Sequence, residues 1–211
     1  MYIPEHFEET RIDVLHHLIR NHPFGTLITV CDGEITADHV PFLIEQSGRD
    51  FGTLKCHVAR SNPVWKTMSE QVESLVVFQG PDSYVSPSWY PSKQNHGKAV
   101  PTWDYIVVHA RGVPEAKNDV DWLLNHVSQL SDTHEESRAI PWKVSDAPTE
   151  YINKLVGAIV GIEIPIIQIS GKWKVSQNRP KSDQAGVVAG LASEGSDSAK
   201  AISKIIQEIG S

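Results

Sequence analysis

The first half of the chain contains short runs in which apolar and polar residues alternate, and turn residues separate these runs. Alternation with a period of two residues is typical of β-strands that bury one face. The pattern predicts strands at residues 26–30, 35–44, 51–57, 74–79 and 101–111. Asp32-Gly33, between the first two runs, indicates a tight hairpin turn, and Pro41 indicates an edge or a bulge in the second strand.

Apolar residues spaced three and four apart predict helices between and after these strands. Helices are expected at residues 11–20, from Asn62-Pro63 to about Ser69, after the cap Asp119 and after Pro148. Residues 131–142 are polar and are expected to form a solvated loop, and residues 160–169 are expected to form one more strand. The Gly-, Ala- and Ser-rich residues 182–211 end in an amphipathic stripe of isoleucines, which are Ile202, Ile205, Ile206 and Ile209.

This order of elements favours a fold that is mainly β with helices (α+β). Closely spaced strands joined by hairpin turns indicate an antiparallel barrel, because a parallel sheet would need a helix between successive strands. The chain has 211 residues, no internal repeat and no low-complexity linker. We therefore expect a single domain over residues 1–211 with peripheral and C-terminal helices.

Charge and cysteine content restrict the function further. The 19 basic and 26 acidic residues give a net charge of −7, with a pI of about 5.8. A surface that binds the phosphates of DNA needs clustered positive charge, so direct DNA binding is doubtful. Two cysteines without CxxC spacing, no signal segment and no apolar run long enough for a bilayer predict a cytoplasmic protein with no membrane contact.

Residues 78–105 concentrate the aromatic side chains between two predicted strands. Tyr84, Trp89, Tyr90 and Trp103 lie here among hydroxyls and prolines. Flat and partly polar rings on an irregular segment suit a planar heteroaromatic ligand, which they can stack on and hydrogen-bond. The alternative is an ordinary aromatic turn that caps a barrel, because aromatic residues are as common in cores as in sites. Composition alone does not decide between the two.

Four motifs in order carry a family resemblance. They are MYIPEHF at the start, HVARSNPVW in the first half, GPDSYVSPSWY followed by VPTWDY in the centre, and KVSQNR near residue 179. Together they resemble the PaiB-type, FMN-binding family of negative transcriptional regulators. The clearest departure is Asp104, where the family motif has asparagine. The resemblance implies an antiparallel split β-barrel related to pyridoxamine-phosphate oxidases and flavin reductases, and a homodimer with FMN at the subunit interface.

The resemblance also implies two groups of cofactor-binding residues. Lys55, His57 and Arg60, followed by Asn62, would hold the FMN phosphate at a strand end that runs into a helix. Without the resemblance, a solvated basic turn is the simpler interpretation. The second group would contact the flavin ring and its carbonyls, and it comprises Ser86, Thr102, Trp103, Tyr105, Gln177, Asn178 and Arg179. For the last three residues, a polar turn is the alternative.

The family resemblance implies negative regulation of transcription, with a flavin-based redox sensor as one form of it. The alternative function is a flavin-dependent oxidoreductase of unknown substrate on the same barrel. No nucleophile with an activating base is recognisable, so no catalytic residue is assigned, and the histidine and cysteine spacing predicts no metal site. Trp89, Tyr90 and Trp103 are expected to form an apolar patch that supports the homodimer.

Overall fold

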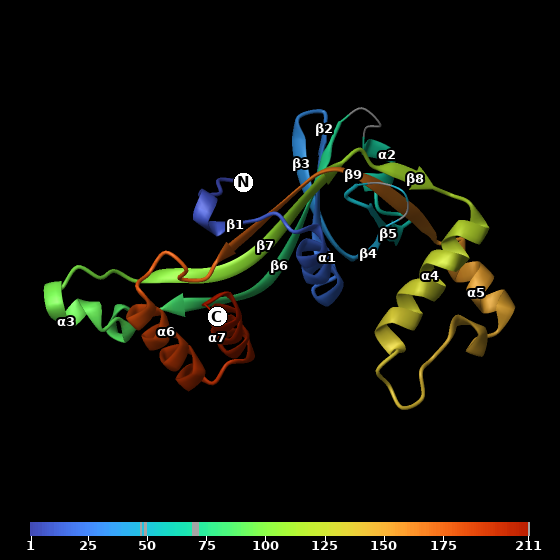
Figure 1. The fold of residues 1–211 in the computed structure, drawn as a ribbon. Coiled ribbons are helices and arrows are strands. Elements are labelled where there is room, and N and C mark those ends of the chain that lie inside the picture. Colours follow the sequence, from blue (N-terminus) through green and yellow to red (C-terminus); the bar gives the residue numbers. More distant parts are fainter. Residues whose placement is uncertain (47, 49, 69–71, 211) are drawn as a thin grey trace. The chain divides into compact units, whose positions relative to one another are not determined.

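The computed structural model describes residues 1–46, 48, 50–68 and 72–210 (Figure 1). Its strands are β1 Glu8–Glu9, β2 Phe24–Cys31, β3 Glu34–Pro41, β4 Leu43–Glu45, β5 Thr53–Ala59, β6 Ser74–Val85, β7 Thr102–Gly112, β8 Glu115–Lys117 and β9 Ile159–Lys174. Its α-helices are α1 Ile12–Asn21, α2 Val64–Thr67, α3 Ser92–His96, α4 Val120–Glu135, α5 Thr149–Val156, α6 Lys181–Glu194 and α7 Asp197–Gly210. The short 3₁₀ helices are η1 Glu5–Phe7, η2 Pro87–Trp89 and η3 Val144–Asp146.

The strands belong to one sheet in the order β3-β2-β6-β7-β9-β5-β4, and β1 and β8 also pair with β9. The pairs β2–β3, β2–β6, β4–β5 and β5–β9 are all antiparallel. The order is an open path, because within the described residues β3 and β4 end it and do not pair with each other. This confirms the expected class, which is mainly β, antiparallel and split rather than closed.

The chain forms two compact units, the first built from three segments and the second from two. Unit 1 comprises Met1–Leu18, Gln79–Val108 and Ser170–Ser211. Unit 2 comprises Ile19–Phe78 and His109–Ile169. The long strands β6, β7 and β9 each contribute residues to both units, so neither unit is a continuous piece of the sequence. That residues 1–211 fold as one domain remains a prediction.

The β2–β3 hairpin of unit 2 follows directly from its turn residues. Asp32 and Gly33 have φ angles of 51° and 85°, the left-handed region that a two-residue hairpin turn requires. The predicted strand at residues 35–44 is split, because Phe42 leaves the ladder and is buried edge-on against Phe78 at 5.4 Å between ring centroids. Pro41 therefore ends β3, which lies at the edge of the sheet as predicted.

The helices of unit 2 confirm two predicted starts and correct one end. Asp119 caps α4 by accepting a hydrogen bond from the Trp122 N–H at 2.8 Å, and α5 begins directly after Pro148. The polar segment at residues 131–142 is not all loop, since α4 continues to Glu135 before the chain turns toward α5. α2 begins at Val64 with Pro63 as its N-cap, one residue later than predicted, and its predicted end at Ser69 lies outside the described residues.

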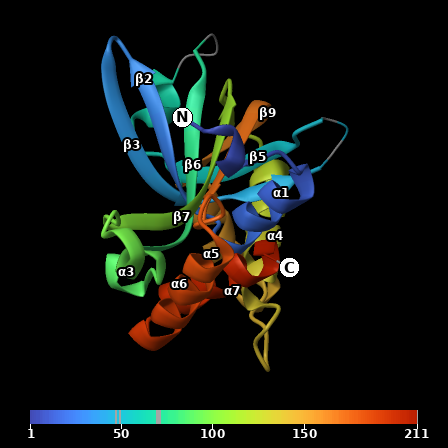
Figure 2. The same ribbon diagram turned by 60° about the vertical axis from the view of Figure 1, so that its left-hand side comes forward.

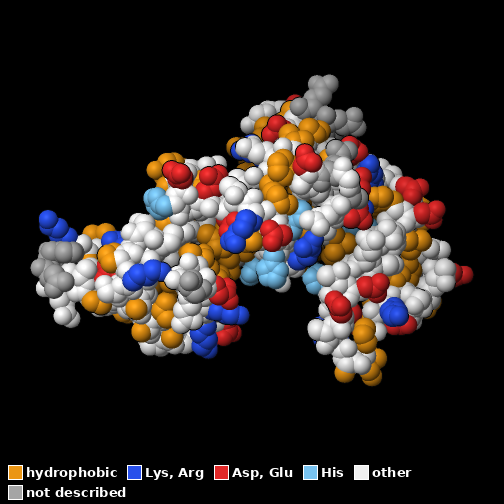
Figure 3. Space-filling model, viewed as in Figure 1, with side chains coloured by type: hydrophobic (Ala, Val, Ile, Leu, Met, Phe, Trp, Pro, Cys, Tyr) orange, Lys and Arg blue, Asp and Glu red, His pale blue; other side chains and the backbone are white. Residues whose placement is uncertain are grey.

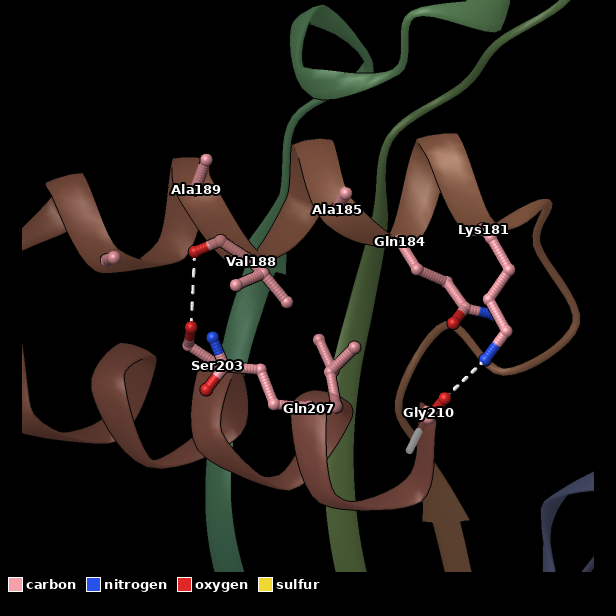
Figure 4. Close-up of a pocket in the computed structure, with 10 residues that line it drawn as sticks. Lys181, Gln184, Ala185, Val188, Ala189, Ser203, Gln207 and Gly210 are labelled. Carbon is pink, nitrogen blue, oxygen red and sulfur yellow. Dashed lines mark hydrogen bonds between the residues drawn. The ribbon is translucent and has the colours of Figure 1, made fainter.

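In unit 1 the helices α6 and α7 lie side by side in both views (Figures 1 and 2). The predicted isoleucine stripe lies on α7, where Ile202 and Ile206 are buried, whereas Ile209 at its end is 44% exposed. Lys181 at the start of α6 donates to the Gly210 carbonyl at 2.6 Å, and Ser203 donates to the Val188 carbonyl at 3.1 Å (Figure 4). These bonds tie the two helices together beside a shallow cavity of about 450 Å³.

Two glycines of α6 make room for Trp89 in η2. A Cβ atom at Gly186 would lie 2.0 Å from the Trp89 carbonyl oxygen, and one at Gly190 would lie 2.2 Å from the indole ring. Real side chains do not approach so closely, so only glycine permits this contact. Residues 182–194 show little hydrophobic periodicity because glycines, rather than large apolar residues, form the face of α6 that contacts the Trp89 ring.

We expect Gly190→Ala to destabilise the protein by about 1–3 kcal/mol, because the new methyl group displaces the Trp89 ring. Alanine is the better helix former by about 1 kcal/mol, so a loss of stability must come from the tertiary contact. The measurement is the free energy of unfolding from urea titration.

Gly157→Ala is the matched control, since its Cβ would meet only the Asn153 and Lys154 carbonyl oxygens at 3.5 Å. We expect that change to stay within about 0.5 kcal/mol of wild type. Equal stability of Gly190→Ala and wild type would show that Trp89 does not depend on the glycine face.

Candidate functional site

Lys174 of β9 is the centre of the polar contacts in unit 1. Its Nζ donates to Thr102 Oγ1 at 2.7 Å and to the Trp103 carbonyl, and it lies 3.5 Å from Asp104 Oδ1. One ammonium group therefore contacts three consecutive residues of the PTWDY motif. Thr102, a predicted ring contact, is positioned by this lysine.

Asp104, the residue that departs from the expected motif, is buried. Its Oδ2 accepts a hydrogen bond from Ser176 Oγ at 2.7 Å. Burial raises the pKa of the Asp104 carboxyl, while the Ser176 hydroxyl and the Lys174 charge oppose that rise. Ser176 has a φ of 60°, an uncommon value for a residue with a side chain, and the bond to Asp104 helps to hold it there.

The aromatic residues of the central segment divide into exposed and covered ones. Trp103 is 55% exposed and Tyr84 is 46% exposed, and their rings meet edge to face with centroids 6.0 Å apart. Tyr90 is buried and Trp89 is half-buried against α6. The expected apolar patch of Trp89, Tyr90 and Trp103 is therefore corrected, because only Trp103 is exposed and Tyr84 joins it.

The SQNR turn after β9 lies in the same unit. The Arg179 guanidinium stands 4.9 Å from the centre of the Tyr90 ring, and within the described residues the buried Tyr90 hydroxyl has no hydrogen-bond partner. Gln177 is used locally, since its Oε1 accepts from the Val175 N–H at 2.8 Å and its amide donates to the Trp173 carbonyl at 2.5 Å. Asn178 is exposed.

Ser86 and Tyr105 complete the predicted ring group. Ser86 caps η2, because its hydroxyl accepts from the Ser88 N–H at 3.2 Å. The Lys172 ammonium lies 5.3 Å from the centre of the Tyr105 ring. All seven predicted ring residues thus belong to unit 1, while the four predicted phosphate residues belong to unit 2.

In unit 2, Arg60 directly follows β5, and its side chain hydrogen-bonds the backbone around the start of β9. Its Nε and Nη2 donate to the carbonyls of Gly157 and Ile159, each at 2.8 Å, and its Nη1 donates to Asn118 Oδ1 at 2.9 Å. These bonds use three of the five N–H donors of a guanidinium. Arg60 can therefore contact a phosphate only with the remaining two.

Lys55 is bound by carboxylates. Its Nζ lies 2.5 Å from Glu45 Oε2 and 3.7 Å from Glu163 Oε1. Lys117 bridges the same Glu163 at 2.9 Å and Glu115 at 2.8 Å. Two lysines against three glutamates leave this cluster with one surplus negative charge, which is unfavourable for a phosphate.

His57 points to a different partner from Lys55, although both lie on the same face of β5. Its Nδ1 is 3.1 Å from Nε2 of the buried His126, whose ring stacks on Trp122. Burial lowers the pKa of His57, and burial together with the nearby positive charges lowers the pKa of His126 to about 4. Both rings are therefore neutral near pH 7.

Asn62 precedes Pro63, the N-cap of α2, and its side chain binds the first residue of the helix. Its Oδ1 accepts from the Val64 N–H at 2.9 Å, and its amide donates to Asp38 Oδ1 at 2.6 Å. Lys55, His57, Arg60 and Asn62 thus have four separate sets of partners, and the structure does not gather them around one point. Their role at the phosphate stays a prediction.

The chemistry of unit 1 fits the ring of FMN. A flavin ring needs a flat apolar surface and fixed donors near its carbonyls and N1, where negative charge grows on reduction. The exposed Trp103 ring offers the surface, and the Tyr84 ring meets it edge to face. Lys174 and Arg179 offer positive charge, and the Tyr90 hydroxyl, which has no partner within the described residues, offers a donor. Sequence reasoning missed Lys174 and Tyr90 as donors, although the alternation of Lys172 and Lys174 on β9 was a usable signal.

The open antiparallel sheet, with an exposed aromatic ring on β7 and Lys174 on β9, is that of a split-barrel protein whose chemistry suits a flavin. The FAD and heme binding protein from Mycobacterium smegmatis shares this fold with a TM-score of 0.60 at 19% identity, over 87% of this chain and 80% of that one. No helix in the described part of the chain combines the length and apolar character needed to cross a membrane.

The family follows from sequence comparison. Residues 1–168 match the family described as "Putative FMN-binding domain". The Bacillus subtilis (strain 168) "Protease synthase and sporulation protein PAI 2" is 30% identical over 99% of this chain and 97% of its own length. A protein from Emericella nidulans is 33% identical over 100% of this chain and 98% of its own length. The chain therefore belongs to the PaiB-type FMN-binding family, and FMN is its cofactor.

We expect Asp104→Asn to be neutral or to stabilise the protein by up to about 1 kcal/mol at pH 7, because an amide still accepts from Ser176 without burying a charge. The folded-state pKa of Asp104 is raised, so the folded protein keeps a proton that the unfolded chain has already lost. Wild type should therefore lose stability relative to the variant as the pH rises from about 4 to 7. Urea unfolding across this pH range measures the difference.

Asp104→Ala is the control, since it removes the acceptor of the Ser176 hydroxyl and the carboxylate partner of Lys174 and should cost about 1–3 kcal/mol at every pH. A wild type that gains stability over Asp104→Asn with rising pH would show that the Lys174 ion pair outweighs burial.

Proposed function

We propose that this protein uses bound FMN to sense redox state in negative regulation of transcription, and that it acts on DNA indirectly. The observation that carries the proposal is the exposed Trp103–Tyr84 ring pair, which lies in the same unit as the cations Lys174 and Arg179. Within the described residues, Thr102, Ser176 and one oxygen of the Asp104 carboxylate are hydrogen-bonded, the Tyr90 hydroxyl is not, and none of them is paired with a base that would make it a nucleophile. Such a site suits holding a flavin more than transforming a second substrate.

Each residue of unit 1 has a distinct proposed role. Trp103 would stack on the ring and Tyr84 would contact it at an angle, while Lys174 and Arg179 would supply positive charge at its edge. FMN, when bound, supplies one- and two-electron redox chemistry. Because Lys174 also contacts Thr102, the Trp103 carbonyl and Asp104, a change in the charge beside it would be felt by three residues of β7.

In unit 2 the proposed phosphate contact is Arg60. It keeps two N–H donors, whereas Lys55 is neutralised by glutamates and His57 is held by His126. The guanidinium is already fixed by backbone carbonyls, so little side-chain freedom would be lost on binding. Asn62 would support this contact by fixing the turn that follows Arg60.

The regulatory role is supported by the relative from B. subtilis, whose name refers to protease synthase and sporulation. An indirect action on DNA is supported by the charge pattern. On the face seen in Figure 3, basic side chains are interspersed with acidic ones, over the α6–α7 pair and over the α4–α5 segment alike. A net charge of −7 adds to this, because binding to duplex DNA requires clustered cations.

We also propose a cytoplasmic homodimer with FMN at the subunit interface. Trp103, Tyr84 and Val100 are exposed apolar residues of unit 1, at 55%, 46% and 66%. Apolar groups gathered at a surface mark contact sites, and a second chain would cover what a flavin leaves open.

We expect the protein to bind FMN at least about tenfold more tightly than riboflavin, since a hydrogen bond to a charged group contributes roughly 1.5–3 kcal/mol. Quenching of flavin fluorescence measures both affinities, and light scattering of the FMN complex should give the mass of two chains. Arg60→Gln should reduce the preference for FMN.

The matched control is Arg138→Gln, which removes an exposed arginine paired only with Glu135 in the described contacts. Equal affinities for FMN and riboflavin would contradict the phosphate role of Arg60. A monomer with flavin still bound would contradict the proposed assembly.

The regulatory proposal predicts that a chromosomal Trp103→Ala substitution, once shown to abolish FMN binding, raises the same transcripts as deletion of the gene.

The purified FMN complex should consume no more than one equivalent of NADH or NADPH per flavin. Its affinity for duplex DNA should be about 10⁻⁶ M or weaker at physiological salt.

Three results would contradict this picture. Sustained consumption of NADH or NADPH with oxygen would favour the oxidoreductase alternative. Nanomolar binding to a defined DNA sequence would make the protein a direct repressor. Unchanged transcripts in the deletion strain would remove the regulatory role altogether.

A further inference from the structure

A second cavity lies entirely within unit 2 and outside the residues assigned to the flavin ring. Its volume is about 450 Å³, and its walls come from β5, α4, η3, α5 and the start of β9. The helices α4 and α5, which supply five of the described lining residues, lie side by side in Figure 1. The volume falls within the roughly 300–1,000 Å³ that is typical of small-molecule sites.

The lining of this cavity is apolar and uncharged. Nine of its eleven lining residues are apolar, and the two polar ones are His57 and Ser131. No aspartate, glutamate, lysine or arginine is among them. A charged ligand would lose its hydration there without gaining a counter-ion, so the lining selects an uncharged molecule.

Exposure distinguishes the mouth of the cavity from its inner wall. Trp142 and Leu155 are 44% and 46% exposed, so they lie at the rim, whereas Val156 is buried. The backbone N–H of Trp142 donates to Glu135 Oε2 at 3.2 Å, which ties the loop before η3 to the end of α4. The rim is therefore fixed by the helix that also supplies one wall.

The hydrogen bond between the two histidines determines what His57 offers to the cavity. His126 is 1% exposed, and within the described residues its Nδ1 has no hydrogen-bond partner. A buried N–H without an acceptor is the rarer arrangement, so the proton of His126 belongs on Nε2, where it is donated to His57 Nδ1. Neutral His57 then carries its own proton on Nε2, which makes it a hydrogen-bond donor.

We propose that this cavity binds a small, uncharged and mainly apolar molecule with one acceptor oxygen, such as a ketone, that His57 Nε2–H hydrogen-bonds. The apolar walls provide most of the affinity, and the single donor orients the ligand. The site is separate from the flavin ring site of unit 1, so it goes beyond the proposed function. It also gives His57 a role different from the phosphate contact that the sequence predicts.

The test uses the neutral fluorescent ketone prodan and its carbonyl-free analogue 2-dimethylaminonaphthalene, titrated against the full chain with FMN bound. We expect one prodan per chain, with blue-shifted emission and quenching of the Trp142 fluorescence by energy transfer. His57→Phe keeps an aromatic ring but removes the donor. It should weaken prodan about two- to tenfold, as the net value of a neutral hydrogen bond implies, and leave the analogue unchanged.

A second variant fills the cavity. It is needed because His57→Phe also removes the partner of His126 and could disturb the fold. Ala158 lines the cavity and is exposed, so Ala158→Trp should block both probes without a large loss of stability. Ala139→Trp is the matched control on the neighbouring exposed loop and should leave both affinities unchanged.

Prodan binding that survives Ala158→Trp, or that falls equally in Ala139→Trp, would overturn the proposal. An equal effect of His57→Phe on the ketone and on its analogue would overturn the role of His57. Release of FMN by prodan, seen as recovery of flavin fluorescence, would show that the cavity belongs to the flavin site. Loss of FMN binding alone would leave this site standing, so the two proposals fail separately.

Discussion

The buried carboxylate of Asp104 sets the constraint on which unit 1 depends. A charge removed from water must be paired and hydrogen-bonded, and here Lys174 and Ser176 meet both needs from one short stretch at the end of β9. That end is thereby fixed against β7. With Asp104 turned inward, the alternation of a strand turns Trp103 outward. The aromatic surface available to a flavin is thus determined by a polar contact on the opposite face of the strand.

Positive charge serves a different purpose in unit 2. Lys55 and Lys117 are matched by a surplus of glutamates, and Arg60 donates to backbone carbonyls at the start of β9. These cations hold strands and loops together rather than forming an open basic surface. A motif rich in lysine, histidine and arginine therefore does not by itself describe an anion site, because each side chain can be neutralised by partners distant in sequence.

The features that were predicted correctly from the sequence depend on short-range interactions. The Asp32-Gly33 turn and the Asp119 cap depend only on neighbouring residues, so both were predicted correctly. The continuation of α4 to Glu135 was missed because an exposed polar face gives no hydrophobic period. Long-range partners could not be found either, since nothing near residue 104 indicates Lys174 and nothing near residue 57 indicates His126.

The contacts that complete unit 1 join residues very far apart in the chain. Ser176 meets Asp104 across 72 residues, Asp183 binds Ser92 across 91, and Ser198 binds Asp82 across 116. Closing such large loops costs chain entropy before any contact forms, which slows folding. During synthesis the central motif strands therefore leave the ribosome long before their partners. Until the end of β9 and the helices α6 and α7 are synthesised, the Asp104 carboxylate has no partner and the Trp89 ring is exposed to solvent. The incomplete chain is most prone to aggregation at this stage.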